Sequence, residues 1–257
     1  MRAIIKLGTS TLTHSTGALN IRRVEKLCKV ISDLKNAGNE IIIVSSGAIG
    51  MGVGKLSLKE RPVDIPTKQA AAAVGQCELM YIYDQLFSAY HHTVAQILLT
   101  AEDIQSENRS ENFHNTINRL MDLGAIPIIN ENDSIATDEI VIGDNDTLAA
   151  MIALKMSADL LIILSDIDGL YTADPRKDPN AKLIHTVTDI NGEVEKYADG
   201  KGSSLSSGGM ITKIRAAKTA TENGTDTVIS NGSDPEILYD IFEGKNAGTR
   251  FISQVKR

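Results

Sequence analysis

The sequence predicts an α/β fold, in which helices cover both faces of a mostly parallel central sheet. Short continuous runs of Ile, Val and Leu, such as 41–44 and 160–164, indicate strands that are buried on both sides. Amphipathic helical patterns separate these runs, and such alternation is typical of parallel sheets. A chain of 257 residues is ordinary for a single α/β unit, so we expect one domain over residues 1–257.

Each strand is predicted from a short apolar run, and each helix from apolar residues spaced three or four positions apart. In chain order, we expect strands at 2–7, 40–45, 94–99, 126–129, 160–164 and 227–230. We expect helices from 21 up to Gly38, and over 68–90, 107–123, 144–156, 209–222 and 235–242. Residues 135–142 have a polar centre between apolar ends, which indicates a small hairpin projecting from the sheet.

Composition and charge exclude several classes of protein. The chain carries 26 Lys and Arg against 33 Asp and Glu, a net charge of −7, whereas a general nucleic-acid binder is expected to be basic. The apolar runs are far shorter than a membrane span, and the amino terminus shows no secretory signal. We therefore expect a cytoplasmic protein that binds neither nucleic acid nor membrane. Cys28 and Cys77 lie in helical patterns and are expected to be buried thiols.

Polar residues and glycines follow the predicted strands, at the point where each strand ends. In an open parallel sheet, ligands bind outside these carboxyl ends. The strand ends read Lys6-Leu7-Gly8-Thr9-Ser10, Ser45-Ser46-Gly47-Ala48, Asn130-Glu131-Asn132-Asp133, Ser165-Asp166 and Ser230-Asn231-Gly232. Lys6, at the edge of a buried strand, requires an anion such as a phosphate or a carboxylate, unless its side chain merely reaches solvent.

Further segments suit phosphate groups, and each has a simpler alternative. The glycines at 47, 50, 52 and 54 lie between a strand and a helix, where backbone amides can approach an anion or can serve chain geometry alone. The segment from Ser206 to Lys213 offers the amides of a helix start and a lysine, although an ordinary flexible helix start would look the same. Asp144 and Asp146 open another helix, where they either cap it or hold lysines beside a phosphate.

Absent motifs narrow the class of enzyme. The phosphate-binding loop GxxxxGK[ST] is absent, as are the HRD and DFG motifs of protein kinases. Neither metal-ligand nor catalytic-triad spacing is found among the histidines, which are His14, His91, His92, His114 and His185. A phosphotransferase with this sequence therefore belongs to neither of those classes.

Several segments combine into a recognisable pattern. They are Lys6-Leu-Gly-Thr-Ser10, Ser45-Ser-Gly-Ala-Ile49, Lys68-Gln-Ala with Val74-Gly-Gln76, Ile129-Asn-Glu-Asn-Asp133, Gly143-Asp-Asn-Asp146, Asp168-Gly-Leu-Tyr-Thr-Ala-Asp-Pro-Arg176 and Gly208-Gly-Met-Ile-Thr-Lys213. Together they resemble the glutamate 5-kinase family, within the amino-acid kinase superfamily, over essentially the whole chain. The resemblance implies a three-layer αβα sandwich around a mostly parallel central sheet.

The resemblance also implies an activity and the residues that perform it. The γ-phosphoryl group of ATP would pass to the side-chain carboxylate of L-glutamate, in the first step of proline biosynthesis. Lys6 and Lys213 would stabilise the transferring group and Asp146 would orient both lysines, with Gly8 and Gly47 as backbone N–H donors. A glutamate side chain, with a pKa of about 4.3, is already ionised near neutrality, so the reaction needs no general base.

Binding roles follow from the same resemblance. Glutamate binding is assigned to Ser46, Asp133 and Asn145. Nucleotide binding is assigned to Lys6, Ser165, Asp166, Ser207, Gly208, Gly209, Met210, Ile211, Thr212 and Lys213. ATP is then the co-substrate, and Mg²⁺ binds mainly through phosphates and water, so no metal-binding residues of the protein are expected.

The resemblance brings further candidate partners. Besides L-glutamate and ATP, they are proline as a competing inhibitor, the next enzyme of the pathway, and further copies of this chain in a homo-oligomer. Many relatives continue into a C-terminal PUA domain, whereas this sequence stops at Arg257, so we expect the kinase domain alone.

Two rival functions stay open at this stage. Another kinase of the superfamily would act on aspartate, acetylglutamate, carbamate or a nucleoside monophosphate, and residues 130–146 would distinguish these substrates. A non-catalytic sensor would bind ATP or an amino acid. Such a sensor would have no use for both Lys6 and Lys213, because stabilisation of a transition state is needed only for catalysis.

Overall fold

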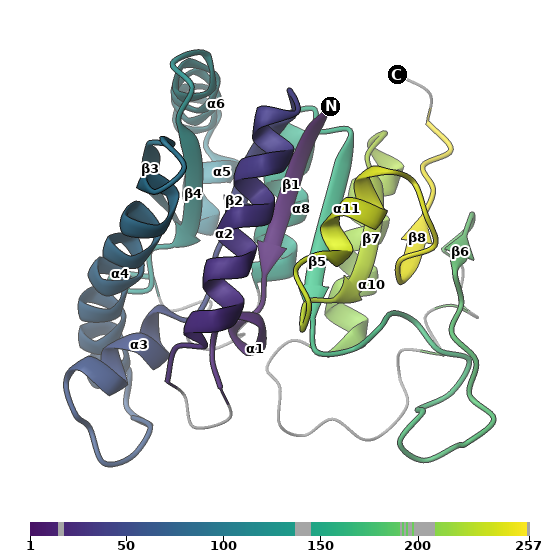
Figure 1. Cartoon of the computed structure of the whole chain (residues 1–257), viewed down its shortest axis with the longest axis horizontal. Coiled ribbons are helices and arrows are strands. Elements are labelled where there is room, and N and C mark those ends of the chain that lie inside the picture. Colours follow the sequence, from purple (N-terminus) through teal and green to yellow (C-terminus); the bar gives the residue numbers. More distant parts are fainter. Residues whose placement is uncertain are drawn as a thin grey trace.

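A sheet of eight strands forms the middle layer of the molecule (Figure 1). The computed structural model describes residues 1–14, 18–136, 145–190, 192, 194, 197 and 209–255. Within them the strands are β1 (Arg2–Leu7), β2 (Glu40–Val44), β3 (Val94–Leu99), β4 (Ile126–Glu131), β5 (Leu160–Ser165), β6 (Thr186–Val187), β7 (Asp226–Asn231) and β8 (Thr249–Phe251). Their order in the sheet is β3-β4-β2-β1-β5-β7-β8-β6.

The sheet is parallel from β3 to β7. The central strand β1 pairs in parallel with β2 on one side and β5 on the other. β8 runs antiparallel to β7, and β6 pairs in parallel with β8. The carboxyl ends of β1, β2, β4, β5 and β7 therefore lie at the same edge of the sheet.

Helices cover both faces of the sheet (Figure 1). They are α1 (Thr9–Leu12), α2 (Ile21–Asn36), α3 (Ala48–Lys55), α4 (Ile65–Ser88), α5 (Ala101–Gln105), α6 (Glu107–Asp122), α8 (Asn145–Lys155), α10 (Met210–Glu222) and α11 (Ile237–Phe242). Adjacent residues of a strand point to opposite faces. Ile4 accordingly packs in the core with α6, α8 and α10, and Ile5 in the core with α2, α4 and α11.

The predicted strands and helices are confirmed within a few residues. α4 begins earlier than expected, at Ile65, because the Asp64 side chain accepts a hydrogen bond from the Thr67 backbone N–H at 2.9 Å and caps the helix. The short elements α1, α3, α5, β6 and β8 were not predicted. The expected hairpin at 135–142 falls largely outside the described residues. The single domain stays a prediction.

Two expectations are wrong. Gly50, Gly52 and Gly54 do not form a turn between a strand and a helix, because they lie inside helix α3. Only Gly47 keeps a turn geometry, with a φ of 93° at the start of that helix. Cys28 is buried as expected, but the Cys77 side chain, on helix α4, is exposed.

Helices α3 and α4 cross at two glycines. A Cβ atom added to Gly52 would overlap the backbone of Ala71, and one added to Gly75 would overlap the carbonyl of Ala48. The close crossing therefore requires glycine at both positions. It fixes the start of α3 beside the end of β2, at the edge of the sheet where the other strands also end.

We expect the substitution Gly75→Ala to lower the free energy of unfolding by about 2–3 kcal/mol, because the added methyl group forces the two helices apart. Gly50→Ala is the matched control, since an added Cβ there meets no atom within 4 Å. It should raise stability by up to about 1 kcal/mol through its better helix propensity. Urea unfolding followed by circular dichroism measures both. Equal stability of the two variants would show that the crossing tolerates a side chain.

Candidate active site

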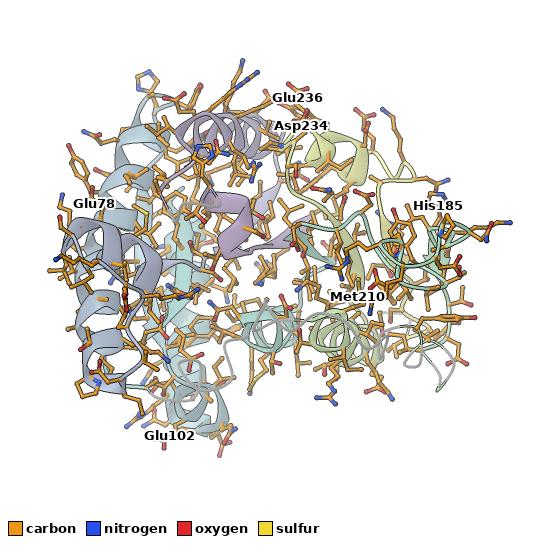
Figure 2. All side chains as sticks on the ribbon, turned by 90° about the horizontal axis from the view of Figure 1, so that it is seen from below. Glu78, Glu102, His185, Met210, Asp234 and Glu236 are labelled. Atoms are coloured by element: carbon orange, nitrogen blue, oxygen red, sulfur yellow. The ribbon has the colours of Figure 1, made fainter. Side chains whose placement is uncertain are left out.

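The polar residues that follow the strands gather at one edge of the sheet. In Figure 1, β1 points toward the lower edge of the molecule, and Figure 2 shows that edge from below. Met210, at the start of α10, is labelled there. The starts of α1, α3 and α10 follow Gly8, Gly47 and Gly209, and each helix start presents backbone N–H groups and the positive end of a helix dipole.

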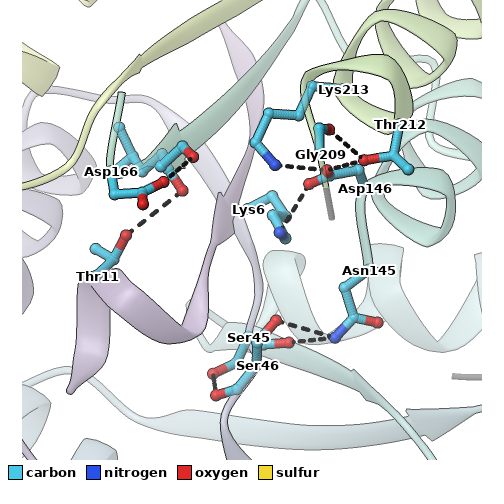
Figure 3. Close-up of polar contacts among 12 residues, drawn as sticks. Lys6, Thr11, Ser45, Ser46, Asn145, Asp146, Asp166, Gly209, Thr212 and Lys213 are labelled. Atoms are coloured by element: carbon cyan, nitrogen blue, oxygen red, sulfur yellow. Dashed lines mark hydrogen bonds and ion pairs between the residues drawn. The ribbon is translucent and has the colours of Figure 1, made fainter. Parts of the chain in front are cut away.

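Lys6, Asp146 and Lys213 form a buried cluster of charges at this edge (Figure 3). Nζ of Lys6 lies 2.7 Å from Oδ1 of Asp146, and Nζ of Lys213 lies 2.9 Å from Oδ2 of the same carboxylate. Thr212 Oγ1 lies 3.2 Å from Oδ2. The Asp146 side chain is 0% exposed, and the two lysine side chains are 8% and 6% exposed. The structure thus brings together the three side chains that the sequence predicts as catalytic.

The charges of this cluster do not balance. Burial alone would raise the pKa of the Asp146 carboxyl, but the charges of Lys6 and Lys213 and their hydrogen bonds outweigh it and lower the pKa to about 2. Asp146 is therefore ionised near neutral pH and lies between two ammonium groups. These three side chains together carry two positive charges and one negative charge, an arrangement that favours the approach of an anion.

Asn145, the first residue of α8, belongs to a buried chain of side-chain amides. Its Nδ2 lies 2.9 Å from the carbonyl oxygen of Ser45, 3.1 Å from Oγ of Ser46 and 2.9 Å from Oδ1 of Asn130. Nδ2 of Asn130 donates to Oε1 of Gln76 at 2.9 Å. These contacts join the end of β2, the end of β4, α8 and α4. Two of the residues predicted to bind the acceptor, at 46 and 145, thus lie in contact.

A cavity of about 420 Å³ opens between α4 and β4, and we call it the α4–β4 cavity. Gln76 and Cys77 of α4 line it, together with Glu131 and Asp133 at the end of β4. Burial, with the nearby charge of Glu131, raises the pKa of Asp133 to about 7. Oδ1 of Asp133 is buried and has no hydrogen-bond partner among the residues that the structure describes. Two neighbouring buried carboxyl groups favour the binding of a cation here.

A second cavity of about 430 Å³ lies between the end of β5 and the start of α10, and we call it the β5–α10 cavity. Several of the residues predicted to bind the nucleotide line it, namely Ser165, Asp166, Gly209, Met210 and Lys213. Because Lys213 lines this cavity and also contacts Asp146, the charge cluster forms one end of the cavity.

Other predicted residues lie close to these. Ile211 and Thr212 belong to the first turn of α10. Gly8 precedes α1, and its backbone N–H donates to the carbonyl of Leu164 at 3.2 Å. Its role as a donor to phosphate stays a prediction, as does that of Gly47. The remaining predicted residues, 207 and 208, lie outside the described part of the chain.

Sequence reasoning missed several residues of the site. Asp168 accepts hydrogen bonds from the Tyr171 hydroxyl and the Asn231 side chain, both at 2.8 Å, and all three line the β5–α10 cavity. The hydrogen bond to Asp168, with partial burial, raises the pKa of Tyr171. Gln76 and Asn130 were also missed as site residues. These five residues all lie in segments that the sequence analysis had already singled out, either strand ends or family motifs. Membership of those segments was the signal that could have identified them as site residues.

Comparison with known proteins decides the family. The family model described as "Amino acid kinase family" matches residues 1–231. The chain belongs to the amino acid kinase family. Curated relatives within that family are named glutamate 5-kinase. One from Clostridium acetobutylicum is 54% identical over 255 residues, which cover 99% of this chain and 96% of the relative.

Further curated relatives carry the same name, glutamate 5-kinase. The glutamate 5-kinase of Clostridium perfringens is 51% identical over 257 residues, covering 98% of this chain and 96% of the relative. That of Carboxydothermus hydrogenoformans is 48% identical over 257 residues, and the match covers 100% of this chain but 69% of that longer protein. These relatives place this amino acid kinase family member among the glutamate 5-kinases.

A solved structure confirms the αβα fold of the family. Carbamate kinase from Giardia lamblia bound to AMP-PNP matches with a TM-score of 0.69 over 98% of both chains, at 16% identity. In the part of this chain that the structure describes, no helix is long and apolar enough to cross a membrane. The same residues contain no group of three or more His, Cys, Asp or Glu side chains that could hold a metal ion.

We expect Asp146→Asn to lower the free energy of unfolding by about 3–5 kcal/mol, because it removes the buried carboxylate that pairs with two buried ammonium groups. The matched control is Asp122→Asn, at an exposed carboxylate 4.0 Å from Arg119, which should change stability by less than about 0.5 kcal/mol. Urea unfolding at pH 7 measures both variants.

This effect should depend on pH. The pKa of Asp146 is lowered from 3.8 to about 2, so its contribution is fully present above pH 5 and is lost as pH falls toward 2. The difference between the wild type and Asp146→Asn should therefore shrink over that range. A difference that stays constant down to pH 2 would contradict the assigned ion pairs.

Proposed function

We propose that the chain transfers the γ-phosphoryl group of ATP to the γ-carboxylate of L-glutamate and gives L-glutamyl 5-phosphate and ADP. The observation that carries this proposal is the buried cluster in which Asp146 holds Lys6 and Lys213 side by side. Lys213 of the cluster lines the β5–α10 cavity directly. Asn145, next to Asp146, connects the cluster to the α4–β4 cavity through Asn130 and Gln76. The relatives named glutamate 5-kinase support the choice of acceptor.

The β5–α10 cavity suits the nucleotide. It begins at the end of a parallel strand and is lined by Gly209 at the start of helix α10, a combination that favours phosphate groups. Lys213 then lies where the transferring phosphoryl group would be, with its ammonium held by Asp146. The hydrogen-bonded Asp168 and Tyr171 form another part of the wall and can position the rest of the nucleotide.

The α4–β4 cavity suits the acceptor amino acid. The carboxyl groups of Asp133 and Glu131 can bind the α-ammonium group of glutamate, and a cation there would remove the cost of their mutual repulsion. The side chain of the acceptor would extend past Ser46 and Asn145 toward the lysines, where its γ-carboxylate reacts. An acceptor without a free ammonium group would lack the cation that this acidic wall attracts.

The chemistry requires little besides position and charge. The γ-carboxylate is already ionised and attacks without a general base. Repulsion between this anion and the phosphates is the main obstacle, and Lys6 and Lys213 reduce it while they stabilise the charge of the transition state. Because Asp146 holds both ammonium groups in place before substrates bind, the site needs little rearrangement during the reaction.

Mg²⁺ is part of the proposal through the phosphates of ATP. The Asp146 carboxylate is fully occupied by two lysines and so is not available to a metal ion. Asp166, which is exposed on the wall of the β5–α10 cavity, can approach an ion carried by the phosphates. A single carboxylate beside the phosphates fits Mg²⁺, which takes most of its ligands from phosphates and water. When bound, the ion would neutralise part of the phosphate charge.

The deciding experiment measures ADP release from Mg-ATP in the presence of hydroxylamine, which traps an acyl phosphate as a stable hydroxamate. L-glutamate, aspartate, N-acetylglutamate and UMP are compared as acceptors. We expect turnover and hydroxamate only with L-glutamate. Turnover with another acceptor would replace the glutamate assignment, and ATP binding without any turnover would favour a sensor.

Lys213→Ala is the control for catalysis by the charge cluster. It should lower kcat by a factor on the order of a hundred or more, because one preorganised charge is lost from the transition state. Circular dichroism and ATP binding verify that the variant is folded. A folded variant with nearly normal turnover would remove Lys213 from the catalytic role.

Asp133 should give glutamate binding a pH dependence. Its carboxyl has a raised pKa of about 7 before the substrate binds, and only the ionised form attracts an ammonium group. We expect kcat/KM for glutamate to fall about tenfold per pH unit below pH 7. The raised pKa also means that the unliganded protein loses stability as pH rises from about 4 to 7, because the folded state binds more protons than the unfolded state there.

Asp133→Asn separates these two effects. At pH 8 it should stabilise the unliganded protein, because it removes a charge that is costly to bury, and weaken glutamate binding in the same variant. Thermal melting and steady-state kinetics measure the two properties. A variant that is destabilised at pH 8 and keeps the acid limb of kcat/KM would show that another group titrates.

Other properties implied by the resemblance stay predictions. They are a cytoplasmic location, a homo-oligomer, inhibition by proline at the glutamate site and a complex with the next enzyme of the pathway. An acyl phosphate hydrolyses readily, so direct delivery to the next enzyme would protect this product.

A further inference from the structure

Two backbone groups fix the direction of the amide chain that runs from Asn145 through Asn130 to Gln76. The carbonyl oxygen of Ser45 can only accept a hydrogen bond, so the atom of Asn145 that faces it at 2.9 Å is the donor Nδ2. The backbone N–H of Glu131 can only donate, so the atom of Asn130 that faces it at 3.0 Å is the acceptor Oδ1. Neither amide can be reversed without the loss of a buried hydrogen bond.

The orientation of Gln76 follows from these anchors. Because Oδ1 of Asn130 is taken by Asn145 and by the backbone, its Nδ2 faces Gln76 and donates to Oε1 at 2.9 Å. Nε2 of Gln76 is therefore turned away from the chain of amides. It makes no hydrogen bond to any residue that the structure describes, and it is not among the fully buried unpartnered atoms. Since Gln76 lines the α4–β4 cavity, its free N–H groups face that cavity.

The α4–β4 cavity consequently offers two kinds of partner. Asp133 and Glu131 on one wall attract a cation, and Nε2 of Gln76 on the α4 wall is a donor for an anion. Ala48, the first residue of α3, also lines the cavity and adds the positive end of a helix dipole. An α-amino acid carries an ammonium group and a carboxylate on the same carbon atom, and so matches both walls.

We propose that Gln76 determines specificity for a free α-carboxylate on the acceptor. Its Nε2 donates a hydrogen bond to the α-carboxylate of bound glutamate, while Oε1 is held by Asn130. This inference rests on the proposed function, because it concerns the end of glutamate that is not phosphorylated. Gln76 selects the substrate and takes no part in the transfer of the phosphoryl group.

The test compares L-glutamate with its α-amide, which has a neutral carboxamide in place of the α-carboxylate. Gln76→Glu keeps an oxygen that can accept from Asn130 and replaces the N–H donor by an anionic oxygen. That oxygen repels the α-carboxylate of glutamate but accepts a hydrogen bond from the α-amide. We expect the ratio of kcat/KM for glutamate to kcat/KM for the α-amide to fall by roughly 100-fold relative to the wild type.

A merely structural role would give a different result. If Gln76 only supported Asn130, the substitution would change kcat/KM for both acceptors by the same factor. An unchanged ratio would therefore overturn the proposal. Gln76→Met, which has no hydrogen-bond donor and no charge, is the second variant should Gln76→Glu fold poorly. It should lower the ratio by roughly tenfold, through a higher KM for glutamate and an unchanged KM for ATP.

Alkylation of Cys77 supplies a measure of binding that does not depend on turnover. Cys77 is exposed and lines the α4–β4 cavity, whereas Cys28 is buried and is an internal control for folding. Glutamate should protect Cys77 of the wild type from iodoacetamide. In Gln76→Glu the concentration of glutamate needed for half-protection, relative to that of the α-amide, should rise by roughly 100-fold over the wild type, and an unchanged relative concentration would contradict the proposal.

These readouts also separate this proposal from the proposed function. A wild type that forms no hydroxamate from glutamate and gains no protection of Cys77 from it would overturn the proposed function and the role of Gln76 together. A wild type that shows both, with an unchanged substrate ratio in the Gln76 variants, would overturn the role of Gln76 alone.

Discussion

The site depends on one buried carboxylate, that of Asp146, which holds Lys6 of β1 and Lys213 of α10 in a single arrangement. Each ammonium group would be costly to bury without a partner, and the two would also repel each other. With one carboxylate between them, both lysines can lie almost fully buried at this edge of the sheet. In the proposed reaction, the same two ammonium groups face the phosphate groups of ATP.

Helix α8 connects the charge cluster to the amide chain. Asp146 holds the lysines, and the preceding residue, Asn145, anchors the amide chain that reaches Gln76 in the other cavity. The helix itself is fixed, because Ala149, Ala150 and Ile152 are fully buried in the core on that face of the sheet. A shift of α8 would therefore disturb the charge cluster and the amide chain together. In the proposed reaction, this shared support would hold both reacting groups in position.

The sequence predicted the fold and the need of Lys6 for an anionic partner because both follow from local rules, whereas the grouping of Asp146 and Lys213 with Lys6 came from the family resemblance. Apolar runs identify the strands, parallel strands end at one edge, and a lysine after buried residues requires an anion. The close crossing of α3 and α4 was not predictable in this way, because Gly52 and Gly75 read as turn signals or weak helix formers until the two helices are seen to touch. The amide chain was missed because its members lie on three different elements, α8, β4 and α4, and their contacts depend on how these elements pack together.

The choice of a neutral amide at position 76 has a physical reason. An arginine or lysine there would bind an α-carboxylate more strongly, but it would also pair with Asp133 and Glu131 across the same cavity. Such an ion pair would fill the cavity, and the substrate would have to break it before binding. A glutamine whose carbonyl is already held by Asn130 can donate to a carboxylate and has no charge with which to compete for the acidic groups. The acidic wall thus stays available for the ammonium group, and the cavity favours an acceptor that brings both charges.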